Sequence, residues 1–140
     1  MEIEKTLQTP APFLYSKIIA PVQADIAAAG NRQVEASALA GYTYRKQFPD
    51  GEWAKVKVTK NVLNREFAML TITRFSRFKV RYLITPLNPD ATRVRISETV
   101  QPVNWVAQLK QIVTALLVGN KRRRNYGRML DSIERSYMTA

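Results

Sequence analysis

The chain has 140 residues, of which 46% are hydrophobic and 24% charged, the composition of a globular protein large enough to bury its own core. It contains no Cys and no His, which excludes disulfides, thiol nucleophiles, the usual Cys/His zinc sites and a histidine general base. The formal net charge is +11, and such an excess favours nucleic acid, anionic membrane surfaces or acidic ligands as partners.

Targeting signals and cofactor motifs are not visible in the sequence. The N-terminal MEIEKTLQ is acidic where a secretory signal would be basic, so we expect no export signal. The longest apolar stretch, IVTALLVG, is far shorter than the roughly 20 residues that cross a bilayer, so we expect a soluble, cytoplasmic protein without a transmembrane segment. The acidic residues are scattered without a ligand-loop spacing, and we expect neither a metal ion nor a cofactor.

The first thirty residues predict a strand followed by helical structure. Residues 1–7, MEIEKTL, alternate and indicate a short strand. Thr9 is a plausible N-cap for the helical segment that follows. In FLYSKIIAPVQADIAAAG, Pro21 is expected to kink or split the helix into two short helices, with Gly30 as a C-terminal stop.

From residue 39 the hydrophobic period changes to two, which predicts strands. Asp50-Gly51 is a strong hairpin signal, and TPLNPDAT is a loop because of its prolines, Asn and Asp. The alternating stretches lie near residues 42–48, 54–62, 66–73, 78–84 and 94–100. Because they follow one another directly, a meandering antiparallel sheet is the simplest arrangement.

A long helix is predicted from Trp105 to about Tyr137, because only two glycines interrupt it. About 30 helical residues span ~45 Å, so the helix must lie across the whole sheet. Two apolar stripes follow its surface and differ by about a quarter turn. Either the helix bends at Gly119–Asn120, or the second stripe packs on the short helices or on another subunit, as in a homodimer. The first stripe contains Trp105, Leu109, Ile112, Val113, Leu116 and Asn120, and the second Tyr126, Leu130, Ile133 and Tyr137.

The order of strand, short helices, antiparallel strands and long C-terminal helix resembles the START-like, or SRPBCC, superfamily. The segments MEIEKTL with TPAPFLYSKII, AGYTYRKQF and KRRRNYGRMLDSIERSY are similar to a bacterial family within it, domain-of-unknown-function family 3284. This resemblance covers essentially the whole chain and implies one α+β helix-grip domain over residues 1–140. It implies a curved antiparallel sheet of about six strands, two short helices after the first strand, and one long C-terminal helix across the sheet.

The resemblance also implies an elongated cavity between the sheet and the last helix, which in many relatives holds an apolar or amphipathic small molecule. Relatives include polyketide cyclases, carriers, sensors and chaperone co-factors, and the fold alone does not choose among them. The candidate ligand-binding residues are Tyr42, Tyr44, Phe78, Tyr82, Ile96, Glu98, Leu109, Ile112, Val113, Leu116, Asn120 and Arg123. No catalytic residue is assigned, because no second catalytic group is visible.

Glu98 is the unusual residue of the strands, because it is in phase with Val94, Ile96 and Val100 and so faces inward. A buried carboxylate costs several kcal/mol unless it is paired or protonated. Glu98 is therefore either a general base, a residue that orients a polar ligand group, a strand-end residue that reaches solvent, or the partner of an Arg.

The residues of the basic run KRRR lie on different sides of the predicted last helix. Arg123 lies close to the continuation of the first stripe, so it is the residue expected either to reach the cavity and pair with Glu98 or an acidic ligand group, or to keep its head in water. The other bases of this region point away from that stripe or lie at its margin: Lys121, Arg122, Arg124 and Arg128.

Two alternatives to small-molecule binding remain at this point. The basic faces could bind nucleic acid or an anionic membrane surface, although aromatic residues are not interleaved among the strand bases as a stacking binder requires. Those bases are Lys55, Lys57, Lys79, Arg81, Arg93 and Arg95. The other alternative is a cavity enzyme of the polyketide-cyclase type, with Glu98 or a tyrosine as acid or base.

Overall fold

The structure is a computed structural model, and it describes residues 1–30 and 32–139, with the side chains of residues 105–120 left out of the description. Two helices, α1 (Ala11–Gly30) and α2 (Trp105–Met138), accompany six strands, and a 3-10 turn covers Ala36–Ala38. The strands are β1 (Glu2–Leu7), β2 (Thr43–Gln47), β3 (Trp53–Val62), β4 (Glu66–Ile72), β5 (Ser76–Asn88) and β6 (Ala91–Pro102).

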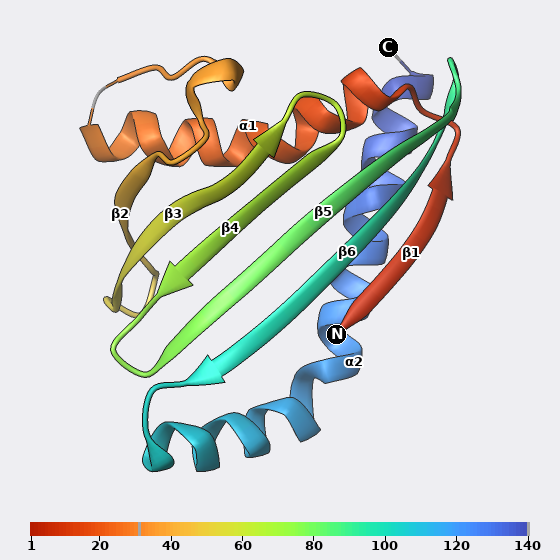
Figure 1. Cartoon of the computed structure of the whole chain (residues 1–140). Coiled ribbons are helices and arrows are strands. Elements are labelled where there is room, and N and C mark those ends of the chain that lie inside the picture. The colour runs from red at the N-terminus through yellow and green to blue at the C-terminus, as the bar shows by residue number, and fades with distance from the viewer. Residues whose placement is uncertain (31, 140) are drawn as a thin grey trace.

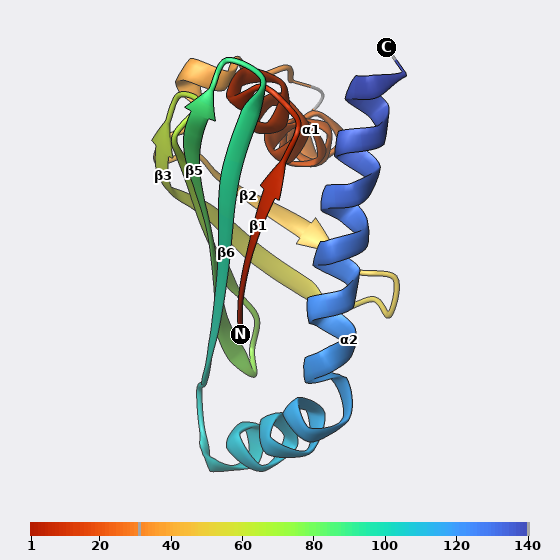
Figure 2. The same ribbon diagram turned by 90° about the vertical axis from the view of Figure 1, so that its right-hand side faces the viewer.

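All six strands form one antiparallel sheet in the order β1-β6-β5-β4-β3-β2 (Figure 1). The meander predicted for β2 to β6 is confirmed, and β1 pairs with β6 at the end of the meander. Both helices lie on the same side of this curved sheet, as the turned view shows (Figure 2). The α+β helix-grip prediction is thus confirmed, and the sheet has an inner face toward the helices and an outer face turned away from them.

The alternation of side chains decides which face of each strand is buried. In β3, Ala54, Val56 and Val58 are buried, whereas Lys55 and Lys57 between them are exposed. The inner face of β5 and β6 continues the core with Val80, Tyr82, Ile84, Val94 and Ile96. Because a shift of register by one residue would expose all of these apolar side chains, the hydrophobic pattern fixes the pairing.

Helix α1 is continuous through Pro21, so the expected split into two short helices does not occur. Its buried residues Leu14, Ile18 and Val22 hold one side of the helix against the core. Pro21 is exposed and so is Lys17, whose carbonyl loses its partner when residue 21 has no N–H. Water can bind that carbonyl, and the packing of the opposite side keeps the helix intact.

The N-cap predicted at Thr9 is not formed by its side chain. Thr9 is fully buried, and its hydroxyl has no hydrogen-bond partner among the described residues. The carbonyl of Thr9 instead accepts a hydrogen bond from the Thr92 hydroxyl at 2.7 Å, which ties the start of α1 to β6.

Substituting Pro21 by alanine is expected to stabilise the protein. A proline inside a helix costs roughly 3 kcal/mol relative to alanine, and the greater freedom of the unfolded alanine chain offsets part of this. We therefore expect the free energy of unfolding to rise by ~1–2 kcal/mol, measured by urea denaturation followed by circular dichroism. A lower free energy of unfolding for the variant would show that Pro21 has a packing role that its exposure does not reveal.

Helix α2 starts beyond one end of the sheet, changes direction, and then runs along the inner face (Figures 1 and 2). The second apolar stripe docks this later part within the same chain, because Leu130 and Ile133 are buried in the core. Tyr137 meets Phe13 of α1 edge-on, with 5.1 Å between the ring centroids. The bend and the packing on α1 that the two stripes predicted are both present, while the first-stripe side chains lie outside the described residues.

Candidate functional site

Among the described residues, the inner face carries one buried acidic residue, Glu98 of β6, with 4% of its surface exposed. Arg122 of α2 binds it with two hydrogen bonds, from Nε to Oε1 at 2.8 Å and from Nη2 to Oε2 at 2.9 Å. The hydroxyl of Tyr126 donates a further hydrogen bond to Oε2. The guanidinium carbon of Arg122 also lies 4.9 Å from the ring centroid of Phe78 on β5. Of the alternatives for Glu98, the structure supports the salt bridge to an Arg.

The partner of Glu98 is Arg122, which was expected to point away from the first stripe or lie at its margin, so that expectation is wrong. Of the two alternatives for Arg123, the structure supports an exposed side chain with its head in water. Arg122 precedes Tyr126 by four residues and Leu130 by eight, and therefore continues the second apolar stripe toward the N-terminus of α2. Docking of that stripe turns Arg122 to the sheet and leaves Arg123 exposed. The prediction used the rotation of the first stripe; the line from Arg122 through Tyr126 to Leu130 was the signal in the sequence.

The phenol groups at this site are held in their neutral form. Burial raises the pKa of Tyr126 far above its ordinary value of 10.0, and interactions with Tyr82 and Glu98 raise this pKa further. Burial and the charge of Glu98 raise the pKa of Tyr82 to about 12. The hydrogen bonds to Glu98 raise the pKa of Arg122. At neutral pH the site therefore combines a charged ion pair with two un-ionised hydroxyl groups.

These shifts predict a loss of stability in alkaline solution. A phenol whose pKa is raised on folding holds its proton more tightly in the folded state, so its contribution is complete below pH 10 and is lost as pH rises through 10 toward the folded value. We expect a free energy of unfolding that declines above pH 10, and a shallower decline for Tyr82→Phe. Urea denaturation at a series of pH values measures this. Equal slopes for the variant and the parent would contradict the placement of Tyr82.

The inner face becomes less covered beyond Glu98. Along β6, Val94 and Ile96 are fully buried, whereas Val100 is 37% exposed. On the neighbouring strands Met69, Thr71 and Phe78 are partly exposed. The register places Phe78 opposite both Thr71 and Val100. Glu98 and Arg122 thus stand at the boundary between the filled core and a partly open strip that we call the apolar strip: Met69, Thr71, Phe78 and Val100.

The structure brings together four of the predicted site residues: Phe78 and Tyr82 on β5, and Ile96 and Glu98 on β6. Tyr42 is partly buried beside β2, and Tyr44 is buried within it, at the opposite edge of the sheet. Burial, together with the charge of Asp25 on α1, raises the pKa of Tyr44 there to about 12. The remaining predictions fall outside the described side chains: Leu109, Ile112, Val113, Leu116 and Asn120.

Two further features limit the kinds of site that the structure offers. Among residues whose side chains are described, no group of three or more acidic residues could hold a metal ion. A pocket of about 330 Å³ lies at the end of α1, and no salt bridge is among its lining residues. The pocket is lined by Gln23, Ala24, Ala27, Gln33, Val34 and Glu35. The ion pair at Glu98 is therefore the stronger candidate.

Comparison with sequence families identifies the chain. The family model described as "Domain of unknown function (DUF3284)" matches residues 1–119. This chain belongs to the DUF3284 family. No curated protein matches the DUF3284 chain in sequence.

Solved structures resemble the DUF3284 chain over nearly its full length. Protein MLL2253 from Mesorhizobium loti has a TM-score of 0.61 at 14% identity, with 96% of this chain and 93% of that chain covered. Norcoclaurine synthase from Thalictrum flavum, in complex with dopamine and hydroxybenzaldehyde, has a TM-score of 0.61 at 12% identity, covering 99% and 86%. The Aha1 dimer from Colwellia psychrerythraea has a TM-score of 0.56 at 12% identity, covering 98% and 94%. At these identities the likeness shows a shared START-like fold.

Within the described residues, neither helix has an apolar stretch of the length that a membrane span requires.

Proposed function

We propose that this DUF3284 protein binds an amphipathic small molecule between the inner sheet face and α2. The apolar body of the ligand rests on the apolar strip, and its hydrogen-bond-accepting end meets Arg122. One observation carries the proposal: a buried carboxylate–guanidinium pair stands beside partly exposed apolar side chains on the concave side of the sheet.

The ion pair is better explained by binding than by stability. Burying the Glu98 carboxylate, whose side chain is 3% exposed, is costly, and well-packed apolar residues in place of a buried ion pair often stabilise a protein as much or more. The pair does, however, give Arg122 a fixed orientation over Phe78. A fixed guanidinium beside an apolar surface is suited to recognition of a ligand, because little side-chain freedom is lost on binding.

The unused hydrogen-bonding groups define the polar end of the ligand. Glu98 accepts hydrogen bonds from Nε and Nη2 of Arg122, and the Tyr126 hydroxyl also lies against this guanidinium. Within the described part of the chain, no acidic group binds Nη1, which carries two further N–H donors. The Arg122 side chain is 46% exposed, so these groups are accessible. Only acceptors can bind them, and we therefore infer a carboxylate or carbonyl group on the ligand.

The shared fold supports this proposal without deciding the ligand. Norcoclaurine synthase, which has the same fold, is found in complex with dopamine and hydroxybenzaldehyde, two small molecules with an aromatic body and polar groups. A START-like fold can thus hold ligands of the proposed size.

A panel of paired compounds tests the proposal. Fatty acids and aromatic carboxylates, each with its alcohol analogue, are added to the purified protein while its thermal unfolding is recorded. We expect an acid to raise the melting temperature more than its alcohol, because a ligand that binds only the folded state stabilises it. Arg122→Lys should remove the preference for the acid, and Arg123→Lys should keep it.

Denaturing extraction of the purified protein, followed by mass spectrometry, covers ligands outside the panel. Release of an amphipathic molecule with an acceptor group would support the proposal. If nothing is released and no compound moves the melting temperature, the inner face is not a ligand site.

A further inference from the structure

On the outer sheet face, the bases that form ion pairs lie at one end, and the bases without an ion pair among the described residues lie at the other. Toward β1 and the β5–β6 turn, Glu66 binds Arg81 at 2.8 Å and Lys60 at 3.7 Å. In the same region Glu4 binds Arg95 at 2.8 Å. The charge of these bases is thereby largely balanced by acidic residues on neighbouring strands.

The other end of the outer face carries bases that have no acidic partner among the described residues. The register aligns Arg45, Lys55, Ile72 and Arg77 in one row across β2 to β5, and Lys57, Leu70 and Lys79 in the next row. All five bases are exposed, and no ion pair joins any of them to an acid within the described part of the chain. We call this set the basic strip: Arg45, Lys55, Lys57, Arg77 and Lys79.

An exposed aromatic residue lies beside the basic strip. Trp53 begins β3 and is 50% exposed, and the guanidinium carbon of Arg45 lies 4.9 Å from its ring centroid. The sequence reading that no aromatic residue is interleaved with the strand bases is therefore incomplete, because cross-strand pairing brings Trp53 beside Arg45. Leu70 and Ile72 lie among the bases and are partly buried, so they form a flat floor rather than a protruding apolar patch.

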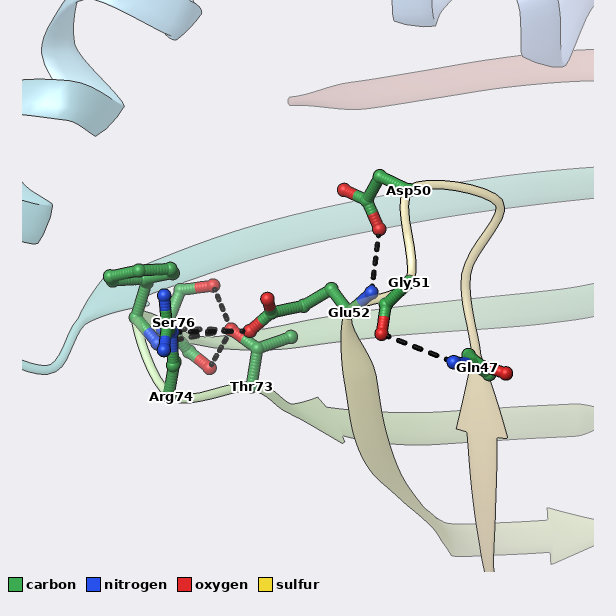
Figure 3. A network of polar contacts seen from close by, with 8 residues as sticks. Gln47, Asp50, Gly51, Glu52, Thr73, Arg74 and Ser76 are labelled. Carbon is green, nitrogen blue, oxygen red and sulfur yellow. Dashed lines mark hydrogen bonds and ion pairs between the residues drawn. The ribbon is translucent and has the colours of Figure 1, made fainter.

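The acidic groups at the border of the basic strip are engaged in their own contacts. Figure 3 shows the β2–β3 and β4–β5 turns side by side, where Glu52 binds Arg74 at 3.6 Å. Asp50 accepts a hydrogen bond from the backbone N–H of Glu52 at 2.9 Å. The guanidinium of Arg74 lies 4.6 Å from the ring centroid of Phe75, which extends the cationic and aromatic character of the border.

We propose that the basic strip binds single-stranded nucleic acid, with phosphates at its Lys and Arg side chains and a base stacked on Trp53. Neighbouring strands are about 4.8 Å apart, so β2 to β5 extend over roughly 14 Å, which is enough for a few nucleotides. Bases unstacked from a duplex can lie on a sheet face and stack on its aromatic side chains. A duplex is a poorer partner, because its major groove admits a helix or ribbon rather than a flat face.

The geometry favours nucleic acid over a membrane surface. Insertion into a membrane uses apolar side chains that protrude from the basic surface. Leu70 and Ile72 between the bases are partly buried, and Trp53 beside them is 50% exposed. Among the exposed large apolar residues, Val62 at the end of β3, Leu63 after it and Leu87 near the end of β5 lie at the opposite end of the sheet, whereas Val103 follows β6 at the same end as the basic strip.

Fluorescence anisotropy with labelled single-stranded RNA and DNA tests the proposal. Each phosphate contact contributes about −0.7 to the slope of log affinity against log salt, so occupation of all five bases gives a slope of about −3.5. The variant K55E/K57E/K79E should lose at least about tenfold in affinity and have a shallower slope. Trp53→Ala should weaken binding with little change of slope, because stacking is uncharged.

A matched control separates this site from the overall charge. The variant R123E/R124E/R128E makes the same change of net charge on exposed side chains of α2 and should retain binding. Circular dichroism melting establishes that each variant is folded. The proposal is overturned by equal losses in both triple variants, by the absence of binding at physiological salt, or by binding to phosphatidylglycerol vesicles and not to oligonucleotides.

Discussion

Replacing Arg122 by alanine is expected to lower the free energy of unfolding by about 3 kcal/mol. The variant leaves the Glu98 side chain, which is 3% exposed, with Tyr126 as its only described side-chain partner. Removing one partner of a buried ion pair costs roughly 3–5 kcal/mol. The lower end applies because Arg122 itself is 46% exposed and water can partly replace its guanidinium. Urea denaturation monitored by circular dichroism measures the difference.

Arg123→Ala is the matched control, because it removes the same side chain one residue later from an exposed position. Its effect should stay within about 0.5 kcal/mol, the usual range for surface substitutions. Combining Arg122→Ala with Glu98→Gln should cost less than the sum of the two single effects, since the uncompensated charge is then absent. Similar losses for Arg122→Ala and Arg123→Ala would contradict the rotation assigned to α2.

Leu130→Ala should be comparably severe, again with a loss of about 3 kcal/mol. Leu130 is fully buried and lies on the stripe that docks the later part of α2. Truncation of a buried leucine to alanine costs roughly 2–5 kcal/mol, through lost transfer energy and the cavity left behind. The same urea measurement applies, and Met138→Ala serves as a control because Met138 is 66% exposed.

The two variants differ in what they report about α2. Leu130→Ala should also reduce the protection of α2 amides from hydrogen exchange, because the stripe no longer holds the helix firmly. A loss below about 1 kcal/mol with unchanged protection would mean that α2 is held by other contacts. The ion pair of Lys5 with Asp131 and the hydrogen bond from the Gln8 N–H to Glu134 are exposed or half-exposed and are weaker candidates.

The strands could be predicted because one face of the sheet is buried. In β3 and β6 the alternation of Val with Lys or Arg records directly which side meets the core. The inward direction of Glu98 followed from the same phase. The partner of Glu98 was missed because the rotation of the first stripe was extended past the bend of α2, where the spacing of Arg122, Tyr126 and Leu130 follows the second stripe.

Other features depended on contacts between distant parts of the chain. Tyr44 shares the phase of core residues, yet β2 is the far edge of the sheet and α1 supplies its neighbour Asp25. Pro21 breaks helices locally, but packing of one side of α1 outweighs that preference. The basic strip could not be recognised from the alternation alone, since only the register separates its bases from those that bind Glu4 and Glu66.

Side-chain NMR of the arginine Nε–H groups during ligand titration tests the central claim most directly. With the best carboxylate from the thermal panel, the Arg122 resonance, assigned by its absence in Arg122→Lys, should shift in proportion to binding. The resonances of Arg123 and Arg124, whose side chains are exposed, should remain in place. Binding that leaves Arg122 unshifted, or that shifts only the exposed arginines, would contradict a ligand site at the Glu98–Arg122 pair.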